Sequence, residues 1–486
     1  MDDTVGRKAL KAGTWYTICT FILKGLTFIT TPIFTRLMSE EAVGSYANFA
    51  AWVTILTSVA TLDLYTSVSL AHFEYKDRLK EFMSTITLMG SLVSAVLYGI
   101  CVLFRDQVTE VLGISEYMMH VMFIYFIVSP AVSILHSKFR IYLQYKYTLI
   151  TSLLPAIFSI LTAVLMVVLS EEKDKLNARV TGYYGVWILV SAGIFLYVVL
   201  KGRCFKLEYV KFALPVAIPL ILHTLSNTIL SSSDRVMIKK MCGDTEAALY
   251  SVAYSCAMVV AVLWTSVNQA WGPWCYEKMH RGEDKDIGRV ARPIILVFAG
   301  GVILVILLAP ELLLLMGGEK YMPALPVVAP VMLGYVAQML YTLYVNIEYY
   351  HKKQKQIMLG TMIAAAINVV LNVIFINLFG YAAAAYTTLA GYVALLFIHY
   401  SFVRRIGKQD IYDMKFNVMV LAGSLALGIG VSFLYPLSIL RYLLVGACGG
   451  FLIIFLYRRR KELKACLRKK DIAGILTICH LMKKED

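Results

Sequence analysis

Long apolar stretches dominate the pattern of hydrophobic and polar positions along the chain, and only short polar breaks separate them. Each stretch holds roughly 18 or more predominantly apolar residues, enough for a helix to cross a hydrocarbon core about 30 Å thick. The pattern therefore predicts about fourteen transmembrane helices. The predicted spans are 12–34, 43–71, 82–104, 117–137, 147–170, 180–200, 210–233, 247–274, 290–314, 323–347, 357–379, 381–403, 416–435 and 438–457.

Composition supports this interpretation. Of 486 residues, 59% are apolar and 16% are charged, and the mean hydropathy is +0.70. Soluble domains carry about 25% charged residues, so this chain lacks the charged surface that a soluble fold of its length needs. The predicted fold class is an all-α polytopic membrane protein.

Lysine and arginine are distributed unevenly between the predicted loops. With a cytoplasmic N-terminus, the inside segments carry 35 of the 46 Lys and Arg residues and the outside loops carry 10. This bias follows the positive-inside rule, so we expect both termini on the cytoplasmic side of the membrane. The net charge of +15 then reflects topology, and we expect no nucleic-acid partner.

The connections between predicted spans are short. The longest outside loop lies around Glu171–Arg179 and the longest inside loop around Tyr276–Arg289, which counts against an enzyme with an extramembrane catalytic domain. The nine cysteines form no CxxC pair or metal-ligand spacing. No GxxxxGK[ST] phosphate loop or HExxH motif occurs, so we predict no cofactor, no metal site and no enzymatic activity.

A faint duplication relates the two halves of the sequence. The segment Arg36–Ala47 resembles Asp234–Ala253, and each leads through a Gly- and Tyr-containing stretch into the next span. Parallel repeats of this kind pair two bundles with a substrate site between them. We therefore predict a six-helix bundle at 1–206, a second at 207–410, an extra transmembrane hairpin at 411–457 and a basic cytoplasmic tail at 458–486.

The tail carries ten Lys and Arg residues interleaved with leucine and isoleucine. One interpretation is a helix that lies along the cytoplasmic leaflet and binds anionic lipid. The other is a stop-transfer cluster followed by a solvated tail.

Lys24 is the clearest ionisable group inside a predicted span, about halfway along the first one. A charge at the bilayer centre costs roughly 2.5–3.5 kcal/mol on insertion scales, so it usually faces a cavity or a partner. Lys24 would either offer a positive charge to an anionic substrate or pair internally with Asp63 of the second span. His223 lies in the proline-containing seventh span. It would sense protons, bind phosphate when charged, or form an ordinary hydrogen bond within the bundle.

Arg36, Asp234 and Arg235 lie near the predicted outer ends of spans one and seven. Arginine suits a bidentate grip on phosphate or carboxylate, so these residues would form either a substrate site or an ion-paired gate. Gln269 and Gln338 lie beside aromatic residues and would line a cavity for sugar or form interhelical hydrogen bonds.

Several segments together resemble a known family. They are Thr30–Tyr46, Leu214–Ile238, Asn368–Asn372 and Phe379–Ala384, and the similarity covers roughly residues 10–405. The chain resembles the polysaccharide-transport, or Wzx-type, flippases of the multidrug/oligosaccharidyl-lipid/polysaccharide (MOP) superfamily. Fourteen spans also match that family.

The resemblance implies two six-helix bundles in a V that alternates between inward-open and outward-open states. The implied cargo is a polyprenyl-pyrophosphate-linked oligosaccharide, moved from the cytoplasmic to the outer leaflet of a bacterial plasma membrane for cell-surface polysaccharide biosynthesis. The implied partners are glycan-assembly and polymerisation proteins. Lys24 would attract the pyrophosphate. The alternative is a cation-coupled multidrug exporter of the same superfamily, for which Asp63 would matter more. A membrane enzyme and a scaffold without transport activity are further alternatives.

Overall fold

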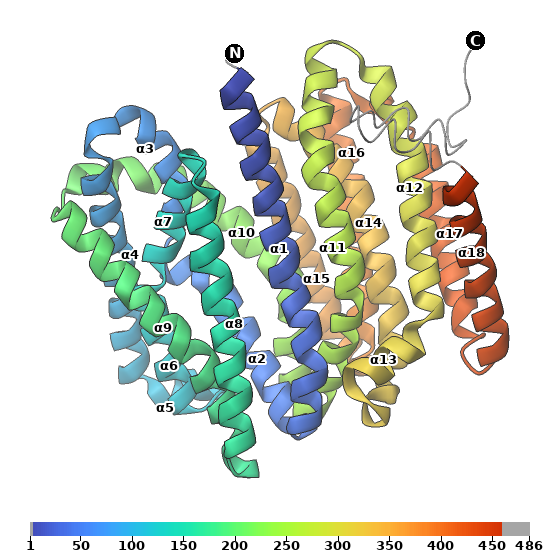
Figure 1. Cartoon of the computed structure of the whole chain (residues 1–486). Helices are drawn as coiled ribbons and strands as arrows, with labels where there is room; N and C mark the ends of the chain where they lie inside the picture. The colour runs from blue at the N-terminus through green and yellow to red at the C-terminus, as the bar shows by residue number, and fades with distance from the viewer. Residues whose placement is uncertain (1–2, 459–486) are drawn as a thin grey trace.

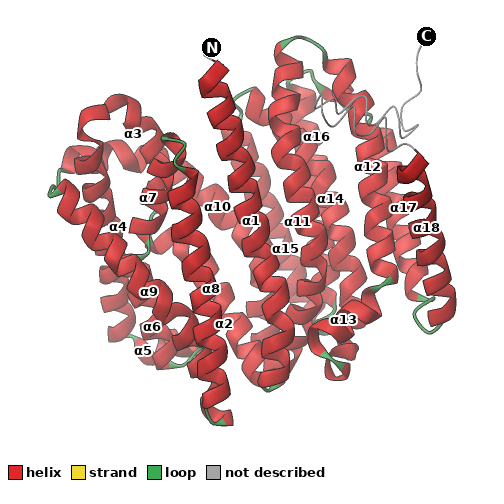
Figure 2. Cartoon of the chain, in the orientation of Figure 1, coloured by secondary structure: helices red, strands yellow, loops and turns green. Residues whose placement is uncertain are grey.

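The computed structural model describes residues 3–458, and this part of the chain consists of helices joined by short loops, with no strand (Figures 1 and 2). The α-helices are α1 (Asp3–Leu37), α2 (Glu40–Ala60), α3 (Val68–Glu74), α4 (Leu79–Leu103), α5 (Arg105–Leu112), α6 (Glu116–Val128), α7 (Pro130–Ile141), α8 (Tyr145–Leu169), α9 (Lys175–Gly202), α10 (Leu207–Met241), α11 (Asp244–His280), α12 (Asp284–Leu307), α13 (Ala309–Gly317), α14 (Leu325–Tyr350), α15 (Gln354–Phe379), α16 (Ala383–Arg405), α17 (Met414–Ser432) and α18 (Ser438–Arg458).

Thirteen helical segments of the described part are long and apolar enough to cross a membrane. The helix α18, with 21 residues, corresponds to the fourteenth predicted span. The predicted fold class, an all-α polytopic membrane protein, is confirmed. The predicted basic tail lies outside the described residues, apart from the backbone of Arg458.

Three predicted spans are each interrupted by a break in the helix, so the prediction of continuous helices there was wrong. The span 43–71 ends as an α-helix at Ala60, because Leu62 and Asp63 adopt left-handed backbone angles with φ of 54° and 37°. A 3₁₀ turn and α3 follow. The span 117–137 divides at Pro130, whose missing N–H and ring favour the first position of a new helix.

The third interruption divides the span 290–314, where α12 ends and α13 begins with a proline in its first turn. Other helices extend beyond the predicted limits. The helix α9 begins at Lys175, five residues early, and α10 continues to Met241, eight residues late. Polar residues assigned to outside loops by hydropathy therefore lie within helices.

The buried core is divided between two halves of the molecule. In Figure 1, α2–α9 gather on one side and α11–α18 on the other, with α1 and α10 between them. Two clusters of buried side chains form around Phe82 and Phe126 in the N-terminal half. A third, around Tyr344, lies mostly in the C-terminal half but also includes Phe34 of α1 and Ala163 of α8. The helix α10 joins the two halves, because its Tyr209 packs in the cluster around Phe82 and its Leu230 packs in the cluster around Tyr344.

The first helix begins and α18 ends at the same end of the molecule, at the top of Figure 1. An even number of crossings requires this arrangement. That this end faces the cytoplasm remains a prediction from the distribution of basic residues.

Candidate functional site

A cavity of about 330 Å³ lies between the two halves, where α1, α2 and α9 face α10 and α11. Small, hydroxyl-bearing and aromatic side chains form most of its wall. The lining residues are Thr27, Thr31, Phe34, Thr35, Val43, Tyr46, Ala47, Ala50, Ala51, Thr54, Arg179, Ser232, Arg235, Ser251, Val252, Tyr254, Ser255 and Met258. The two charged members of this set are both arginines.

Arg179 enters the cavity from α9 and is held between two aromatic rings. Its guanidinium carbon lies 3.6 Å from the ring centroid of Tyr46 and 3.9 Å from that of Phe34. Arginine stacks well on aromatic faces because its guanidinium is planar and weakly hydrated. The buried Nε has no hydrogen-bond partner among the described residues. The stacking therefore fixes the plane of the side chain, and the terminal nitrogen Nη1 also donates to Met38 Sδ at 3.9 Å.

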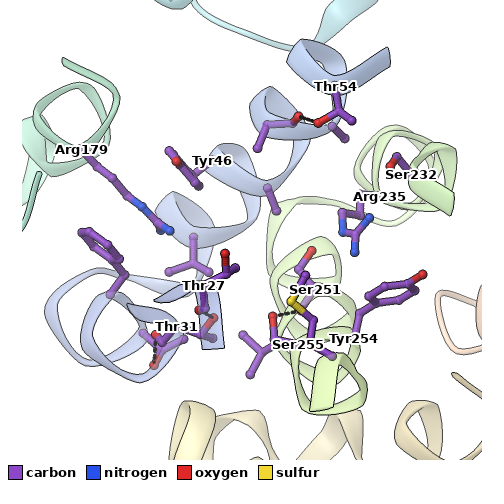
Figure 3. A pocket seen from close by; sticks show the side chains of 18 residues that line it. Thr27, Thr31, Tyr46, Thr54, Arg179, Ser232, Arg235, Ser251, Tyr254 and Ser255 are labelled. Atoms are coloured by element: carbon purple, nitrogen blue, oxygen red, sulfur yellow. Dashed lines mark hydrogen bonds between the residues drawn. The ribbon is translucent and has the colours of Figure 1, made fainter. Parts of the chain in front are cut away.

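Arg235 enters from the opposite side on α10 (Figure 3). Its guanidinium carbon lies 4.4 Å from the ring centroid of Tyr254, and one terminal nitrogen donates to the carbonyl of Ser231 at 3.2 Å. Each half of the molecule thus contributes one arginine stacked on an aromatic ring. Figure 3 shows both side chains directed toward the space between them.

Hydroxyl groups surround the arginines. Figure 3 shows Thr27 and Thr31 of α1, Thr54 of α2 and two serines of α11 around the same space. Hydroxyls donate and accept hydrogen bonds, and two guanidinium groups supply charge-assisted donors in a fork that matches phosphate oxygens. The cavity therefore suits a polar ligand with at least one negative charge.

Lys24 lies next to this cavity without lining it. It precedes Thr27 by three residues and Thr31 by seven, so the three side chains share one face of α1. Its Nζ donates to Thr265 Oγ1 on α11 at 3.1 Å. No ion pair joins Lys24 to Asp63 in the described part of the chain, so the alternative of an internal pair between these two residues is not observed. Lys24 instead links α1 to the C-terminal half one turn from the cavity.

One end of the cavity is closed where α2 and α11 begin. Lys239 Nζ lies 2.7 Å from Asp244 Oδ1 and donates to Ser45 Oγ at 2.9 Å, and the same serine donates to Asp244 at 2.9 Å. These side chains come from α2, α10 and the first turn of α11. The contacts join the two halves, so this end cannot open without breaking them.

Arg36 also lies at the closed end. One of its terminal nitrogens donates to Pro32 O at 2.8 Å and the other to Leu315 O on α13 at 3.1 Å. Arg36 is exposed and does not line the cavity. The predicted cluster of Arg36 with Asp234 and Arg235 is therefore wrong, since α10 continues for about two turns beyond that pair.

Asp234 points away from the cavity into the C-terminal half and is fully buried. Its carboxylate accepts hydrogen bonds from Tyr250 Oη at 2.5 Å, Thr388 Oγ1 at 2.7 Å and Asn372 Nδ2 at 2.8 Å. The neighbouring residues Asp234 and Arg235 thus have different surroundings, because successive side chains of a helix point in different directions. Asp234 joins α10, α11, α15 and α16.

The remaining predicted site residues lie outside the cavity wall. Asp63 is buried at the break after α2, and its Oδ2 has no hydrogen-bond partner among the described residues. His223 Nδ1 lies 2.9 Å from Thr361 Oγ1, between α10 and α15. Gln269 is exposed on α11, and Gln338 is half-buried on α14.

Arg179 was missed by the sequence analysis, which assigned it to an outside loop. The apolar run begins at residue 180, so hydropathy alone places the start of the span there and leaves Arg179 outside it. The remaining signal in the sequence was the pair Tyr183 and Tyr184, one turn after Arg179, because these residues make the start of this span more polar than the rest of it. Aromatic partners of an arginine on other helices cannot be identified from the sequence of α9.

Comparison with known protein families gives a match over much of the chain. The family described as "Polysaccharide biosynthesis protein" matches residues 9–279, more than half of the chain. The chain belongs to this family. No curated protein sequence matches it.

Solved structures show the same fold at low identity. A structure titled "Lipid II flippase MurJ, inward closed conformation" is 15% identical, has a TM-score of 0.69 and aligns over 92% of this chain and 99% of its own. An inward-facing multidrug resistance MATE transporter of the MOP superfamily is 14% identical, with a TM-score of 0.59 over 80% of this chain and 95% of its own. An outward-facing multidrug resistance MATE transporter of the same superfamily is 16% identical and has a TM-score of 0.55. The alignment covers 83% of this chain and 96% of that chain. The family and the fold confirm the resemblance to the polysaccharide-transport branch of this superfamily.

Proposed function

We propose that this protein is a flippase for a polyprenyl-pyrophosphate-linked oligosaccharide. It moves the headgroup from the cytoplasmic to the outer leaflet of the bacterial plasma membrane by alternating access, for cell-surface polysaccharide biosynthesis. The observation that carries the proposal is the pair Arg179 and Arg235, which face one hydroxyl-lined cavity from opposite halves. This role is transport without catalysis.

The chemistry of the cavity fits the two parts of such a headgroup. A pyrophosphate offers several anionic oxygens, and guanidinium groups bind these with paired N–H donors. The hydroxyls of Thr27, Thr31 and Ser255 match the hydrogen bonding of a sugar. The prenyl tail remains in the hydrocarbon, because exposing its apolar surface to water would be unfavourable.

Alternating access would follow from the fact that the two halves of the molecule each contribute part of the site. The contacts of Ser45 and Lys239 with Asp244 hold one end closed, and we infer that this end faces outward. Separation of the halves there would move Arg179 away from Arg235 and release a pyrophosphate held by both. Lys24, one turn from the cavity toward the start of α1, attracts the anion on its approach.

The charge of the cavity argues against the alternative, a cation-coupled multidrug exporter. Its lining residues include two arginines and no carboxylate. A cationic drug would meet repulsion there, whereas an anionic headgroup would be attracted. The likeness to multidrug transporters is a likeness of fold, and function depends on the site.

Proteoliposomes that contain the protein and a fluorescent polyprenyl-pyrophosphate oligosaccharide test the proposal. A membrane-impermeant glycan probe reports which leaflet holds the headgroup. Wild type should equilibrate it, and Arg179→Gln with Arg235→Gln should reduce the rate at least tenfold, equivalent to about 1.4 kcal/mol. The control Arg404→Gln removes an exposed arginine far from the cavity and should behave as wild type.

Depletion in the native host provides the second arm. Accumulation of lipid-linked oligosaccharide in the cytoplasmic leaflet would support flipping. Unchanged glycolipids together with increased sensitivity to cationic drugs would reject the proposal and favour the multidrug exporter.

A further inference from the structure

A second, smaller pocket lies on the N-terminal half, outside the central cavity. It has a volume of about 110 Å³ and opens between the start of α4 and the ends of α7 and α9, at the same end of the molecule as α3 and the start of α1 (Figure 1). The lining residues are Lys80, Met83, Leu135, Lys138, Tyr197, Val198 and Lys201. Typical sites for drug-sized ligands measure roughly 300–1,000 Å³, so this pocket suits one small chemical group.

Three lysines from three helices converge on this pocket. The close approach of α9 to α4 depends on Gly202, because a Cβ there would overlap with the carbonyl oxygen of Lys80 and the Cβ of Ser84. This packing brings Lys201 and Lys80 to the same pocket. Lys138 arrives from the last turn of α7, and the charges of both other lysines act on it. The fold therefore concentrates three positive charges.

No carboxylate among the described residues forms an ion pair with Lys80, Lys138 or Lys201. The neighbouring acid on α4, Glu81, pairs instead with Lys206 at 2.8 Å. Like charges held together repel one another, and none of the residues that line this pocket is acidic. A bound anion would relieve the repulsion.

The floor of the pocket is apolar. Met83, Leu135 and Val198 are buried below the lysines, while Tyr197 is 49% exposed at the rim. A basic rim above an apolar floor, with an aromatic side chain at the edge, is typical of the membrane–water interface. Basic pockets between transmembrane helices on the cytoplasmic side bind the phosphates of anionic lipid headgroups. A phospholipid matches both parts of this surface, whereas a soluble anion matches only the rim.

We propose that Lys80, Lys138 and Lys201 form a binding site for the phosphate of an anionic phospholipid of the cytoplasmic leaflet. The site is separate from the substrate cavity, and the proposal does not rest on the transported substrate. The bound lipid bridges the ends of α4, α7 and α9, and so stabilises the N-terminal half.

Thermal unfolding in nanodiscs tests the site. The purified full chain is placed in nanodiscs of pure phosphatidylcholine and of phosphatidylcholine mixed with phosphatidylglycerol. Phosphatidylglycerol should raise the unfolding midpoint of wild type by about 3 °C, as expected for a ligand that binds the folded state alone. The triple variant Lys80→Gln, Lys138→Gln and Lys201→Gln should lose most of this increase.

A second triple variant provides the matched control. Lys352→Gln, Lys353→Gln and Lys355→Gln removes the same charge at the same end of the C-terminal half, from exposed positions. It should retain the increase. An equal loss in both triple variants would show general attraction to an anionic surface and would overturn the proposal, as would a wild type that gives no increase.

Two further measurements separate the possible outcomes. If millimolar inorganic phosphate or pyrophosphate produces the whole increase in phosphatidylcholine nanodiscs, the ligand is a soluble anion and the proposed lipid is wrong. If the triple variant fails to fold, native mass spectrometry of Lys138→Gln and wild type compares the phosphatidylglycerol that each retains. Equal retention would contradict the proposed site.

Discussion

Gly44 lies directly against the carbonyl oxygen of Asp244, so that a Cβ at position 44 would overlap with it. Gly44 lies in the second turn of α2, and Asp244 is the first residue of α11; the predicted duplication would relate these two helices. Ser39 caps the start of α2 by accepting the N–H of Ala42 at 3.2 Å. The closed end of the cavity is therefore formed where the N-terminal parts of α2 and α11 meet.

Replacement of Gly44 by alanine should open this end. The added methyl group cannot fit against the α11 backbone, so the halves must separate by a fraction of an ångström or more and the hydrogen bond from Ser45 to Asp244 should weaken. A cysteine placed at Thr54 in the cavity wall, in a background without native cysteines, should react with an impermeant thiol reagent several-fold faster from the outside.

The matched control is Gly99→Ala, because Gly99 lies in α4 with open space around it. It should leave the labelling rate unchanged. Equal rates in Gly44→Ala and wild type would show that α2 and α11 tolerate the methyl group without opening.

Loss of the Asp234 carboxylate should destabilise the C-terminal half. In Asp234→Ala the buried donors of Tyr250, Thr388 and Asn372 lose their acceptor. Leaving buried donors unsatisfied costs about 1–3 kcal/mol each, so we expect a loss of about 3 kcal/mol after local rearrangement. Thermal unfolding in detergent measures it. Asp106→Asn, at an exposed carboxylate, should have no effect, and an unchanged midpoint for Asp234→Ala would exclude the structural role.

Charge alone should not replace Arg179. Lysine keeps the positive charge but lacks the planar guanidinium that stacks between Phe34 and Tyr46. Arg179→Lys should therefore weaken apparent substrate affinity roughly tenfold in the flipping assay, which corresponds to about 1.4 kcal/mol. Arg404→Lys serves as the control. Wild-type affinity in Arg179→Lys would mean that the site recognises charge without geometry.

The appended hairpin should depend on Arg441. This buried side chain donates to both oxygens of Glu311 at 2.8 Å and to the carbonyl of Leu307 at 2.7 Å, linking α18 to α12 and α13. Arg441→Ala leaves the carbonyl and carboxylate without these donors, so α18 should exchange its amide hydrogens at least tenfold faster.

Tyr442→Phe provides a comparison, since it removes a single hydrogen bond to Glu311. It should change the exchange of α18 far less. Equal protection of α18 in Arg441→Ala and wild type would show that apolar packing alone holds the hairpin in place.

Hydropathy predicted the membrane class and nearly every crossing, because a bilayer imposes one requirement on each span separately. Hydropathy failed where the backbone breaks a helix inside an apolar stretch, or where a helix continues beyond its apolar residues. The left-handed residues Leu62 and Asp63 interrupt an apolar stretch, and polar residues such as Arg179 continue a helix beyond its apolar part. Lys24 stood out because its neighbours in sequence are apolar, and it lies one turn from the cavity. Asp234 and Arg235 looked equivalent, yet one is buried and the other faces the cavity.

The sequence by itself determined that the chain is a bundle of membrane helices, the approximate length of each, and the expected orientation, since these properties depend on local composition. Only the tertiary structure decided which charges meet. Arg179 depends on rings from α1 and α2, and Arg235 shares its cavity only because α10 packs beside α2. Such contacts join residues far apart in the chain, and a single sequence records no distance between them.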